Sequence, residues 1–328
     1  MAETSPAKVK VKGISQVAIV VKDVQAVAEN YWSILGIGPW SIYSWESPLV
    51  HDRKYHGKPA WAREKIAAAQ VGGMHLELCQ PVEGNSVYQD FLIEHEEGLH
   101  HLNLLVDELD ETVETLARQG FSSLQSAHVE EGAYHYINIE PIHVVWELVN
   151  SSTKGLHTLP TCYPDKEQSS PAKIKVNGIN QIAIVVKDLR AAMENYWNIL
   201  GIGPWQIYTL EAPLVYDRKY HGRPAWAKEK IALAQVGAAQ LQLCQPIEGD
   251  SIYNDFLIEN GEGLHHLNFS VDNISETVEI LENDGFCSLQ SARAGDAASS
   301  FIDIKPLRAI WAPVYSSEGI NVQPTCYP

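Results

Sequence analysis

Cysteine is scarce and scattered in this sequence. The chain has 5 cysteines in 328 residues and no Cys-x-x-Cys pair. An odd number of isolated thiols argues against a disulfide framework and a thiolate zinc site, and indicates a reducing compartment. The sequence also lacks a run of about 18 apolar residues that could cross a bilayer. The stretch from Met1 to Lys12 has no apolar core of a secretory signal. We therefore expect a cytoplasmic protein with no membrane partner.

Positive charge is also in short supply. Lysine and arginine number 24 against 41 aspartate and glutamate residues, which gives a net charge of −17. Such a field repels phosphate backbones, so nucleic acid is excluded as an expected partner. The hydrophobic content of 45% and charged content of 20% are ordinary for a globular protein. At roughly 150 residues per domain, the length predicts about two domains.

The two expected domains are copies of one unit. GISQVAIVVKD at Gly13 returns as GINQIAIVVKD at Gly178, and three further words return at the same offset of 165 residues. The offset holds without a gap through Trp146 and Trp311. We place the boundary in the polar stretch DKEQSSPAK, so the domains are 8–164 and 165–328. Both tails carry PTCYP, which we expect to be an arm that clasps the neighbouring half.

Each copy divides again into two similar parts. A β-branched run, QVAIVV or HLNLLV, is followed by Asp23 or Asp107 and a helical pattern, and an aspartate in that position can cap a helix. Three strand-like runs come after each helix: WSIYSW, KIAAAQV and MHLELCQ, then SSLQSA, YHYINI and HVVWELV. Each half therefore reads as strand-helix-strand-strand-strand, twice, which predicts an α+β fold.

These sequence segments resemble those of the vicinal oxygen chelate superfamily, which includes glyoxalase I, bleomycin resistance proteins and methylmalonyl-CoA epimerase. The pieces that carry the resemblance are QVAIVVKDVQAVAENYWSILGIG, LELCQP, GLHHLNLLVDELDETVETLARQGF and VVWELV. The resemblance implies paired βαβββ modules that form an open cup-shaped sheet in each half, four modules in all. It also implies one divalent metal, held in a cup by four side chains.

The resemblance places the four metal ligands of the first half at Gln16, Glu77, His101 and Glu147. Strand alternation turns Glu77 away from its leucine neighbours, and turns Glu147 away from Trp146 and Leu148. An imidazole, two carboxylates and an amide oxygen, completed by water, suit octahedral Mg, Mn, Co, Ni or Zn. We therefore expect one divalent metal in this half.

The second half has a different ligand set, and this bears on how the cups close. Its equivalent residues contain no carboxylate, so we expect this cup to be metal-free: Gln181, Gln242, His266 and Ala312. If each half closes its own cup, one complete set and one degenerate set result. If the cups form across the halves, both sets are incomplete. We favour cups that close within each half.

A metal of this kind acts as a Lewis acid that stabilises the enolate of a small carbonyl compound. By the resemblance, Glu147 is the first candidate for the catalytic base and Glu77 the second, while Glu46 is a further acid–base candidate. The sequence thus predicts a metal-dependent isomerase, epimerase or lyase with a small-molecule substrate. It is expected to be a monomer or a homodimer.

Two other functions stay open. A metal-free protein of the bleomycin-resistance type would bind or sequester a small molecule. An Fe(II) ring-cleaving dioxygenase needs two histidines and one carboxylate. That reading is less favoured, because Gln16 takes the first ligand position and alternation is expected to turn His100 away from His101.

Several residues are candidates for binding the substrate. DRKYHGKPAW is nearly identical in both halves, so either it grips an anionic or oxygen-rich ligand at the mouth of the cup, or it packs the halves together. Trp45 has no aromatic counterpart in the second half, and His75 is expected to share a face with Glu77. The candidate substrate contacts are Trp45, Arg53, Tyr55, His56, Lys58 and His75.

Overall fold

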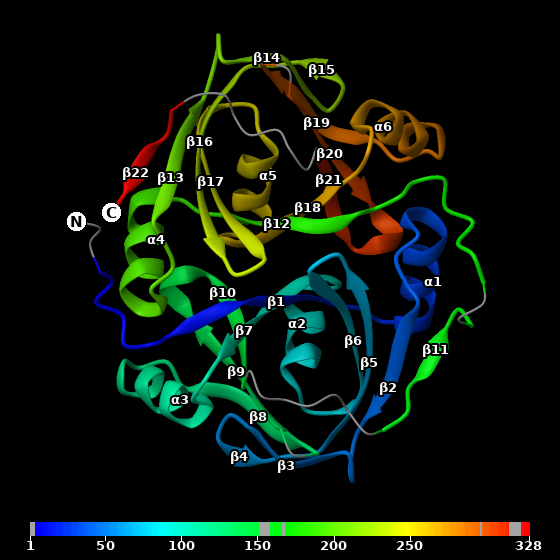
Figure 1. Ribbon diagram of the computed structural model, residues 1–328, viewed down its shortest axis with the longest axis vertical. Coiled ribbons are helices and arrows are strands. Elements are labelled where there is room, and N and C mark those ends of the chain that lie inside the picture. Colours follow the sequence, from blue (N-terminus) through cyan, green and yellow to red (C-terminus); the bar gives the residue numbers. More distant parts are fainter. Residues whose placement is uncertain (1–3, 131, 151–157, 166–167, 296, 315–322) are drawn as a thin grey trace.

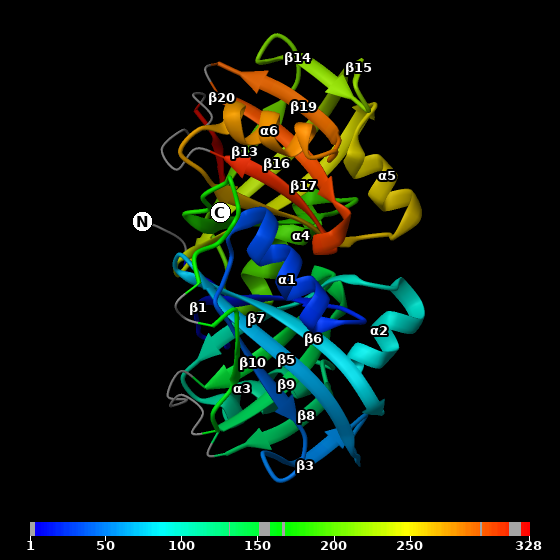
Figure 2. The ribbon, with the colours of Figure 1, turned by 90° about the vertical axis from the view of Figure 1, so that its right-hand side faces the viewer.

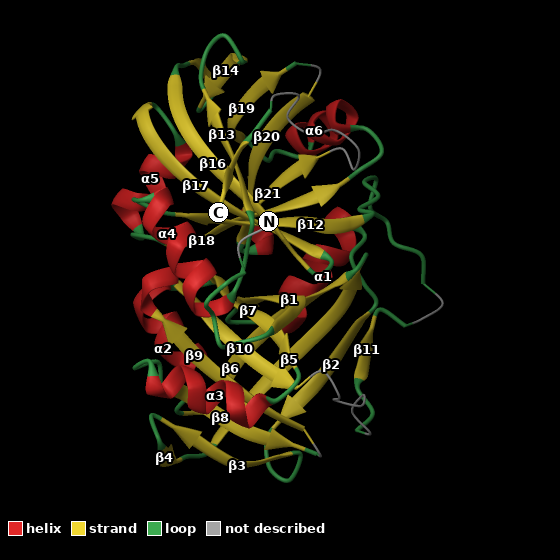
Figure 3. Cartoon of the chain, turned by 60° about the vertical axis from the view of Figure 1, so that its left-hand side comes forward, coloured by secondary structure: helices red, strands yellow, loops and turns green. Residues whose placement is uncertain are grey.

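Two curved sheets, one from each half of the chain, make up most of the protein (Figures 1 and 3). The computed structural model describes residues 4–130, 132–150, 158–165, 168–295, 297–314 and 323–328. Within these ranges, no helix is both long and apolar enough to span a membrane. Every described strand of the first sheet lies between residues 11 and 163, and every one of the second lies between 178 and 327.

The first sheet is built from two modules that meet at its centre. Its strand order is β11-β2-β5-β6-β1-β7-β10-β9-β8-β3-β4. Strand β1 runs antiparallel to β7, and each runs parallel to the last strand of its own module, β6 or β10. The strands are β1 (Val11–Val20), β2 (Trp40–Trp45), β3 (Val50–Tyr55), β4 (Lys58–Pro59), β5 (Ala62–Val71), β6 (Met74–Gly84), β7 (Gly98–Val106), β8 (Ser123–Val129), β9 (Gly132–Ile139), β10 (Val144–Asn150) and β11 (Thr161–Tyr163). The helices are α1 (Val24–Leu35), α2 (Val87–His95), α3 (Leu109–Arg118) and the 3₁₀ turn η1 (Glu140–Ile142).

The second sheet repeats this plan, with the order β15-β14-β19-β20-β21-β18-β12-β17-β16-β13-β22. Its strands are β12 (Gly178–Val185), β13 (Trp205–Leu210), β14 (Val215–Tyr220), β15 (Arg223–Pro224), β16 (Ala227–Val236), β17 (Ala239–Gly249), β18 (Gly263–Ser270), β19 (Ser288–Ala294), β20 (Ala297–Ile304), β21 (Ala309–Val314) and β22 (Thr325–Tyr327). Its helices are α4 (Leu189–Asn195), the π-helical η2 (Tyr196–Leu200), α5 (Ile252–Glu259), α6 (Ile274–Asn283) and η3 (Lys305–Leu307).

The predicted α+β fold of duplicated βαβββ modules is therefore confirmed. All six strand-like runs of the first half are strands, including KIAAAQV within β5. The structure adds elements that the pattern did not predict: the short β3–β4 hairpin inside the first module, and helix α2 between the modules. The proposed domain boundary remains a prediction, and residues 166–167 of that stretch lie outside the described ranges.

Local sequence signals set the ends of the first helix. The Asp23 carboxylate accepts hydrogen bonds from the backbone N–H groups of Gln25 and Ala26, which satisfies the free donors of the first turn. Gly36 ends α1 in the left-handed conformation. The matching expectation for Asp107 is wrong, because α3 begins after Glu108 without a side-chain cap. The Asp107 carboxylate instead pairs with the ammonium group of Lys12.

The two halves share one hydrophobic core, which lies between the sheets. Helix α1 lies in this junction (Figure 2), where its buried Tyr31 donates a hydrogen bond to the carbonyl of Leu307 at 2.8 Å. Tyr196 makes the reciprocal bond to Ile142 at 3.1 Å. One continuous cluster of buried apolar residues contains side chains from both halves. The concave faces of the sheets have separate, smaller apolar clusters of their own.

Two pairs of glycines let the backbones of the two halves touch. Gly72, at a φ of +64°, lies so close to Gly178 that a Cβ on Gly72 would be 2.8 Å from the Cα of Gly178. Gly237, at a φ of +67°, approaches Gly13 in the same way. Only glycine combines this backbone conformation with this lack of side-chain bulk.

The tails behave differently from the expectation. In each half PTCYP forms a strand that pairs with its own sheet: β11 with β2, and β22 with β13. The predicted clasp of the neighbouring half by PTCYP is therefore wrong. The clasp comes instead from the segments before each copy. Ser5 donates to the carbonyl of Trp197, and Ser170 donates to that of Trp32, both at 2.6 Å.

Candidate metal centre

The four ligand positions come from the four central strands of the first sheet, β1, β6, β7 and β10. Alternation sends Val17 and Ile19 into the shared core, while Ala18 and Val20 face the cup. Since these strands all belong to one half, the candidate ligands meet within a single cup. The crossed arrangement, with ligands drawn from both halves, does not occur among the described strands.

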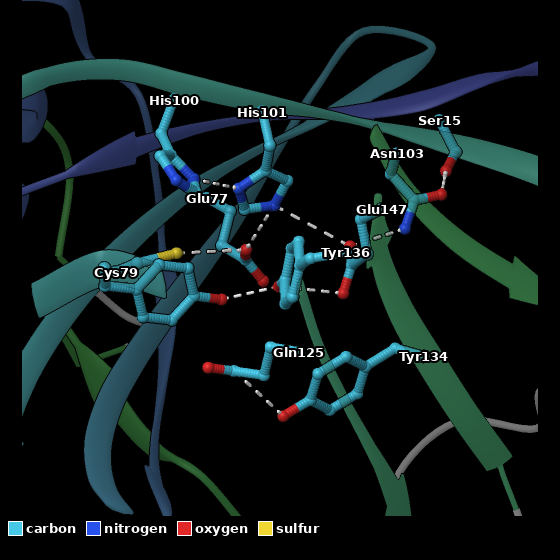
Figure 4. A network of polar contacts seen from close by, with 11 residues as sticks. Ser15, Glu77, Cys79, His100, His101, Asn103, Gln125, Tyr134, Tyr136 and Glu147 are labelled. Atoms are coloured by element: carbon cyan, nitrogen blue, oxygen red, sulfur yellow. Dashed lines mark hydrogen bonds and ion pairs between the residues drawn. The ribbon is translucent and has the colours of Figure 1, made fainter. Parts of the chain in front are cut away.

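Three of the predicted ligands converge on one point (Figure 4). Nε2 of His101 lies 3.6 Å from Oε2 of Glu77 and 3.7 Å from Oε2 of Glu147. The imidazole is fully buried, whereas the two carboxylates are 13% and 11% exposed. Both distances exceed a normal hydrogen bond, and Nε2 has no hydrogen-bond partner. A buried nitrogen thus faces two acidic oxygens across a gap.

Gln16, the fourth predicted ligand, lies at the edge of this group. It is half-buried and stands opposite His75 of β6 and Asn103 of β7 in the sheet register. It lies near enough to the Glu77 carboxyl to favour its ionised form, which counteracts the rise that burial causes in the pKa of that group. The structure therefore brings the first-strand amide to Glu77.

A β-bulge in β7 overturns the expectation about His100. Ala18 is paired with His101 but Ile19 with Leu99, so His100 is the extra residue. Both imidazoles therefore turn to the same side, with their Nδ1 atoms 2.9 Å apart (Figure 4). One Nδ1 must donate and the other accept. When His101 donates, its Nε2 keeps a lone pair directed at the carboxylates.

A set of hydrogen bonds holds the Glu147 carboxylate. Asn103 Nδ2 donates to Oε2 at 2.7 Å, and the Tyr136 hydroxyl donates to Oε1 at 3.0 Å. The hydroxyl of Tyr88, from α2, lies 2.6 Å from that of Tyr136. Glu77 has a weaker hydrogen-bond donor beside it, because its Oε2 accepts from the Cys79 thiol at 3.2 Å. These supporting residues were not predicted, although Asn103 and Tyr136 share the alternation of the ligands.

Burial disfavours every charge in the cup. It raises the pKa of Glu77 to about 7 and raises the pKa of Glu147 as well. It lowers the pKa of His101 to about 4, so this imidazole is neutral near pH 7. A neutral imidazole does not compensate two carboxylates. A divalent cation would do so, because it supplies the missing positive charge at the point where these groups converge.

The second cup is a natural comparison. His266 Nε2 is also buried without a partner, and its Nδ1 lies 2.8 Å from that of His265. Around it, however, neutral amides bond to one another: Asn268 donates to Gln181, and Gln181 donates to Gln240. No carboxylate faces His266 among the described residues. Charge, rather than an isolated nitrogen, therefore distinguishes the first cup.

Comparison with known proteins supports the superfamily assignment. The glyoxalase/bleomycin resistance protein/dioxygenase superfamily matches residues 15–138 and 180–302. The chain belongs to this superfamily. Mitochondrial methylmalonyl-CoA epimerase from Mus musculus is 28% identical over 142 residues, which are 43% of this chain and 71% of the relative. An uncharacterised protein, YqjC of Bacillus subtilis strain 168, is 29% identical over 108 residues, or 33% of this chain and 67% of that protein.

Two solved structures share the fold. A mutant of 4-hydroxymandelate synthase from Streptomyces coelicolor has a TM-score of 0.62 at 13% identity, covering 95% of each chain. The Mn(II)-bound glyoxalase from Novosphingobium aromaticivorans has a TM-score of 0.51 at 12% identity, covering 96% of this chain and 86% of that chain. At such low identity these likenesses concern architecture alone.

Three further candidates have distinct places in this glyoxalase-superfamily chain. Trp45 packs on the apolar lining of the cup, where Leu210 takes its place in the second half. Exposed His75 lines a hollow of about 350 Å³, and its proximity lowers the pKa of Glu77. Glu46 follows β2 at a turn, where its carbonyl accepts from Val50. Among the described residues, the hydrogen bonds and ion pairs of the candidate ligands Glu77, His101 and Glu147 do not include the Glu46 carboxylate.

The residues of DRKYHGKPAW have mainly structural roles. Buried Arg53 donates to both oxygens of buried Glu64, at 2.9 and 2.7 Å. Tyr55 donates to Asp90 of α2, while His56 joins Tyr55 in lining a cavity of about 1000 Å³ that extends over both halves. Lys58 is exposed in β4.

The position of DRKYHGKPAW shows whether this segment packs the two halves together. The hairpin pairs with β8 of its own sheet, and β3 and β4 lie at the outer end of the first half, away from the junction between the halves (Figure 1). Its link to the second half is the open cavity that Tyr55 and His56 help to line. The hypothesis that the segment packs the halves together is therefore wrong. Its similarity in the two halves reflects ion pairs and hydrogen bonds that recur there, between Arg218 and Glu229 and between Tyr220 and Asp255.

Proposed function

We propose that the first half holds one divalent metal and catalyses an isomerisation, epimerisation or lyase reaction of a small carbonyl compound. The observation that carries this proposal is the buried, unpartnered Nε2 of His101, which faces the carboxylates of Glu77 and Glu147. Gln16 completes the proposed ligand set beside Glu77. The mixed nitrogen and oxygen donors suit Mg, Mn, Co, Ni or Zn.

The metal would supply electrostatic stabilisation for negative charge that develops on a substrate oxygen. The chain supplies orientation and a dry environment. Asn103 and Tyr136 hold the two oxygens of Glu147, and His100 fixes the ring of His101. Tyr88 stacks on His101 with ring centroids 6.1 Å apart and covers the cup from α2. These contacts would hold the ligands in place before a substrate arrives.

The proton is taken from the carbon next to the carbonyl by a carboxylate of the cup. Glu147 is our first candidate, by resemblance to glyoxalase-like enzymes. Glu77 is the second, and its weaker hydrogen bonding leaves it freer to move than Glu147. Similarity to methylmalonyl-CoA epimerase supports a substrate with an acidic carbon beside a carbonyl, such as a thioester or an α-hydroxy carbonyl compound.

The first test is the metal content of the purified chain by mass spectrometry, with Glu77→Ala and Glu147→Ala beside it. We expect about one divalent ion in the cup, lost in both variants, and no change in Gln242→Ala, the second-half counterpart of Glu77→Ala. Absence of a cup metal, even after incubation with the five candidate ions, would sink the metal-enzyme proposal. A search for tightly bound small molecules would then follow.

The reaction itself is tested by deuterium exchange from solvent into α-hydroxy carbonyl compounds and thioesters. Exchange that disappears in Glu147→Gln, while the metal is retained, would assign the base to Glu147. The same loss confined to Glu77→Gln would assign it to Glu77. Exchange that is unaffected by both changes would rule out both carboxylates as the base.

A further inference from the structure

A second group of metal-ligating side chains lies on the outer part of the first sheet, on β3 and β8. His51 Nδ1 is 3.1 Å from Oδ2 of Asp52, and His128 Nδ1 is 3.7 Å from the same oxygen. The two imidazole rings stack at 5.4 Å with an interplanar angle of 10°. One ligand atom from each of the three residues falls within 4.8 Å of the others.

The backbone brings these three side chains to one face. His51 and His128 are directly paired across the antiparallel β3 and β8 strands, which places their side chains next to each other. Adjacent residues of a regular strand point to opposite faces, so Asp52 would normally turn away. The register shifts between His51 and Lys54, and Asp52 has a φ of +51°. This bulge re-aims the carboxylate towards the histidines.

The second half has the same bulge without the imidazoles. Asp217 takes the place of Asp52 with a φ of +52°, and the register shifts again after Tyr216. Tyr216 and Arg293 form the cross-strand pair where the first half has two histidines. The aspartate therefore belongs to the bulge in both halves. The pair of histidines is the feature specific to the first half.

We propose that His51, Asp52 and His128 form a surface site for a late first-row divalent cation such as Zn, Ni or Cu. Two imidazoles and one carboxylate, with open positions for water, are the donors these ions prefer. The side chains are 45%, 74% and 55% exposed, so an ion reaches them without opening the fold. The net charge of −17 attracts cations to the surface. A bound ion would cross-link β3 to β8.

Zinc stoichiometry by equilibrium dialysis tests this site. We expect His51→Gln and His128→Gln each to bind one zinc ion fewer than the wild-type chain. The control is His221→Gln. This exposed second-half histidine lies 3.5 Å from Asp255, with no second imidazole in a metal-ligating group beside it among the described residues, and its change should leave the count unchanged. Zinc binding that is the same in the wild type and in both histidine variants would overturn the proposal.

The surface site and the cup are distinguishable. In a chain that carries Glu77→Gln and Glu147→Gln, the addition of His51→Gln should still remove one zinc ion. The surface site thus stands or falls independently of the proposed enzyme function. The double change Tyr216→His and Arg293→His should add one zinc ion to the second half. A failure to gain this ion would overturn the inference that the bulge creates the binding geometry.

Discussion

Tyr136 donates its hydroxyl to Oε1 of Glu147 at 3.0 Å, and both residues differ together in the second half. There Phe301 and Ala312 take the two places, and the ring of Phe301 lies 4.9 Å from His266, as that of Tyr136 does from His101. The tyrosine hydroxyl is therefore present only in the half where a glutamate carboxylate is available to accept its hydrogen bond.

We predict that Tyr136→Phe keeps the fold but weakens the centre. Phe301 shows that a phenyl ring fits this environment. Loss of a hydrogen bond to a metal ligand typically costs about 10–100-fold in metal affinity or activity. The measurement is metal affinity by competition with a chelator, with Tyr134→Phe as control. A Tyr136→Phe affinity equal to that of the control would show that the hydroxyl does not position Glu147.

His100→Gln is predicted to loosen the ring of His101. Their Nδ1 atoms are 2.9 Å apart, so removal of His100 takes away the contact that fixes the orientation of the ligand. We expect a loss of about 10–100-fold in metal affinity. The matched control is His265→Gln, which should not change the metal content of the first cup. Equal metal affinity in both variants would rule out a supporting role for His100.

His265 gives a prediction about pH. Burial lowers the pKa of this imidazole to about 3, below its ordinary value of 6.5. The unfolded chain therefore takes up a proton below pH 6.5 while the native chain does not, and the native state loses stability as the pH falls from 6.5 towards 3. For this single group the loss at pH 5.5 is about 1.4 kcal/mol.

The comparison is between wild type and His265→Gln in urea unfolding at pH 7.5 and 5.5. The free energy of unfolding should fall less in the variant than in the wild type over this range. The quantity compared is the change in the free energy of unfolding between the two pH values, so a variant that is less stable than wild type at pH 7.5 still gives a valid comparison. An identical fall in both chains would mean that His265 accepts protons in the native state.

The contact between Gly72 and Gly178 predicts the effect of a single methyl group. Gly72→Ala must adopt a positive φ and place its Cβ against the opposing backbone. Gly57→Ala also has a positive φ, of +74°, but its Cβ meets nothing within 4 Å. Both variants lose about 1–2 kcal/mol from the backbone conformation. Gly72→Ala should lose roughly 1–3 kcal/mol more from overpacking, measured by chemical unfolding. Equal losses would show that the backbones can separate.

The sequence predicted the regular part of the fold, because it follows from alternation. The candidate ligand positions came from the family resemblance, and alternation accounts only for the face on which two of them lie. A strand period of two places Glu77 and Glu147 on the face opposite to their leucine and tryptophan neighbours, as the structure has them. Departures from that period could not be predicted. The bulge at His100 reverses the side on which that ring lies, and the bulge at Asp52 creates a cluster that a regular strand would separate.

Long-range contacts were also beyond the sequence. Identical tail segments gave no indication of whether they pair with their own sheet or with the neighbouring one. Likewise, Tyr88 approaches His101 only because α2 lies over the cup. The sequence of the helix does not indicate which surface it packs against.

The separation of the shared core from the cup faces has an evolutionary consequence. Because the residues that hold the halves together and those that line each cup point to opposite sides of the same strands, a change in one set leaves the other intact. After duplication, one copy could therefore lose its acidic ligands and still serve as the structural partner of the other. In such a chain the lining of one cup can change without first requiring a new interface between the halves.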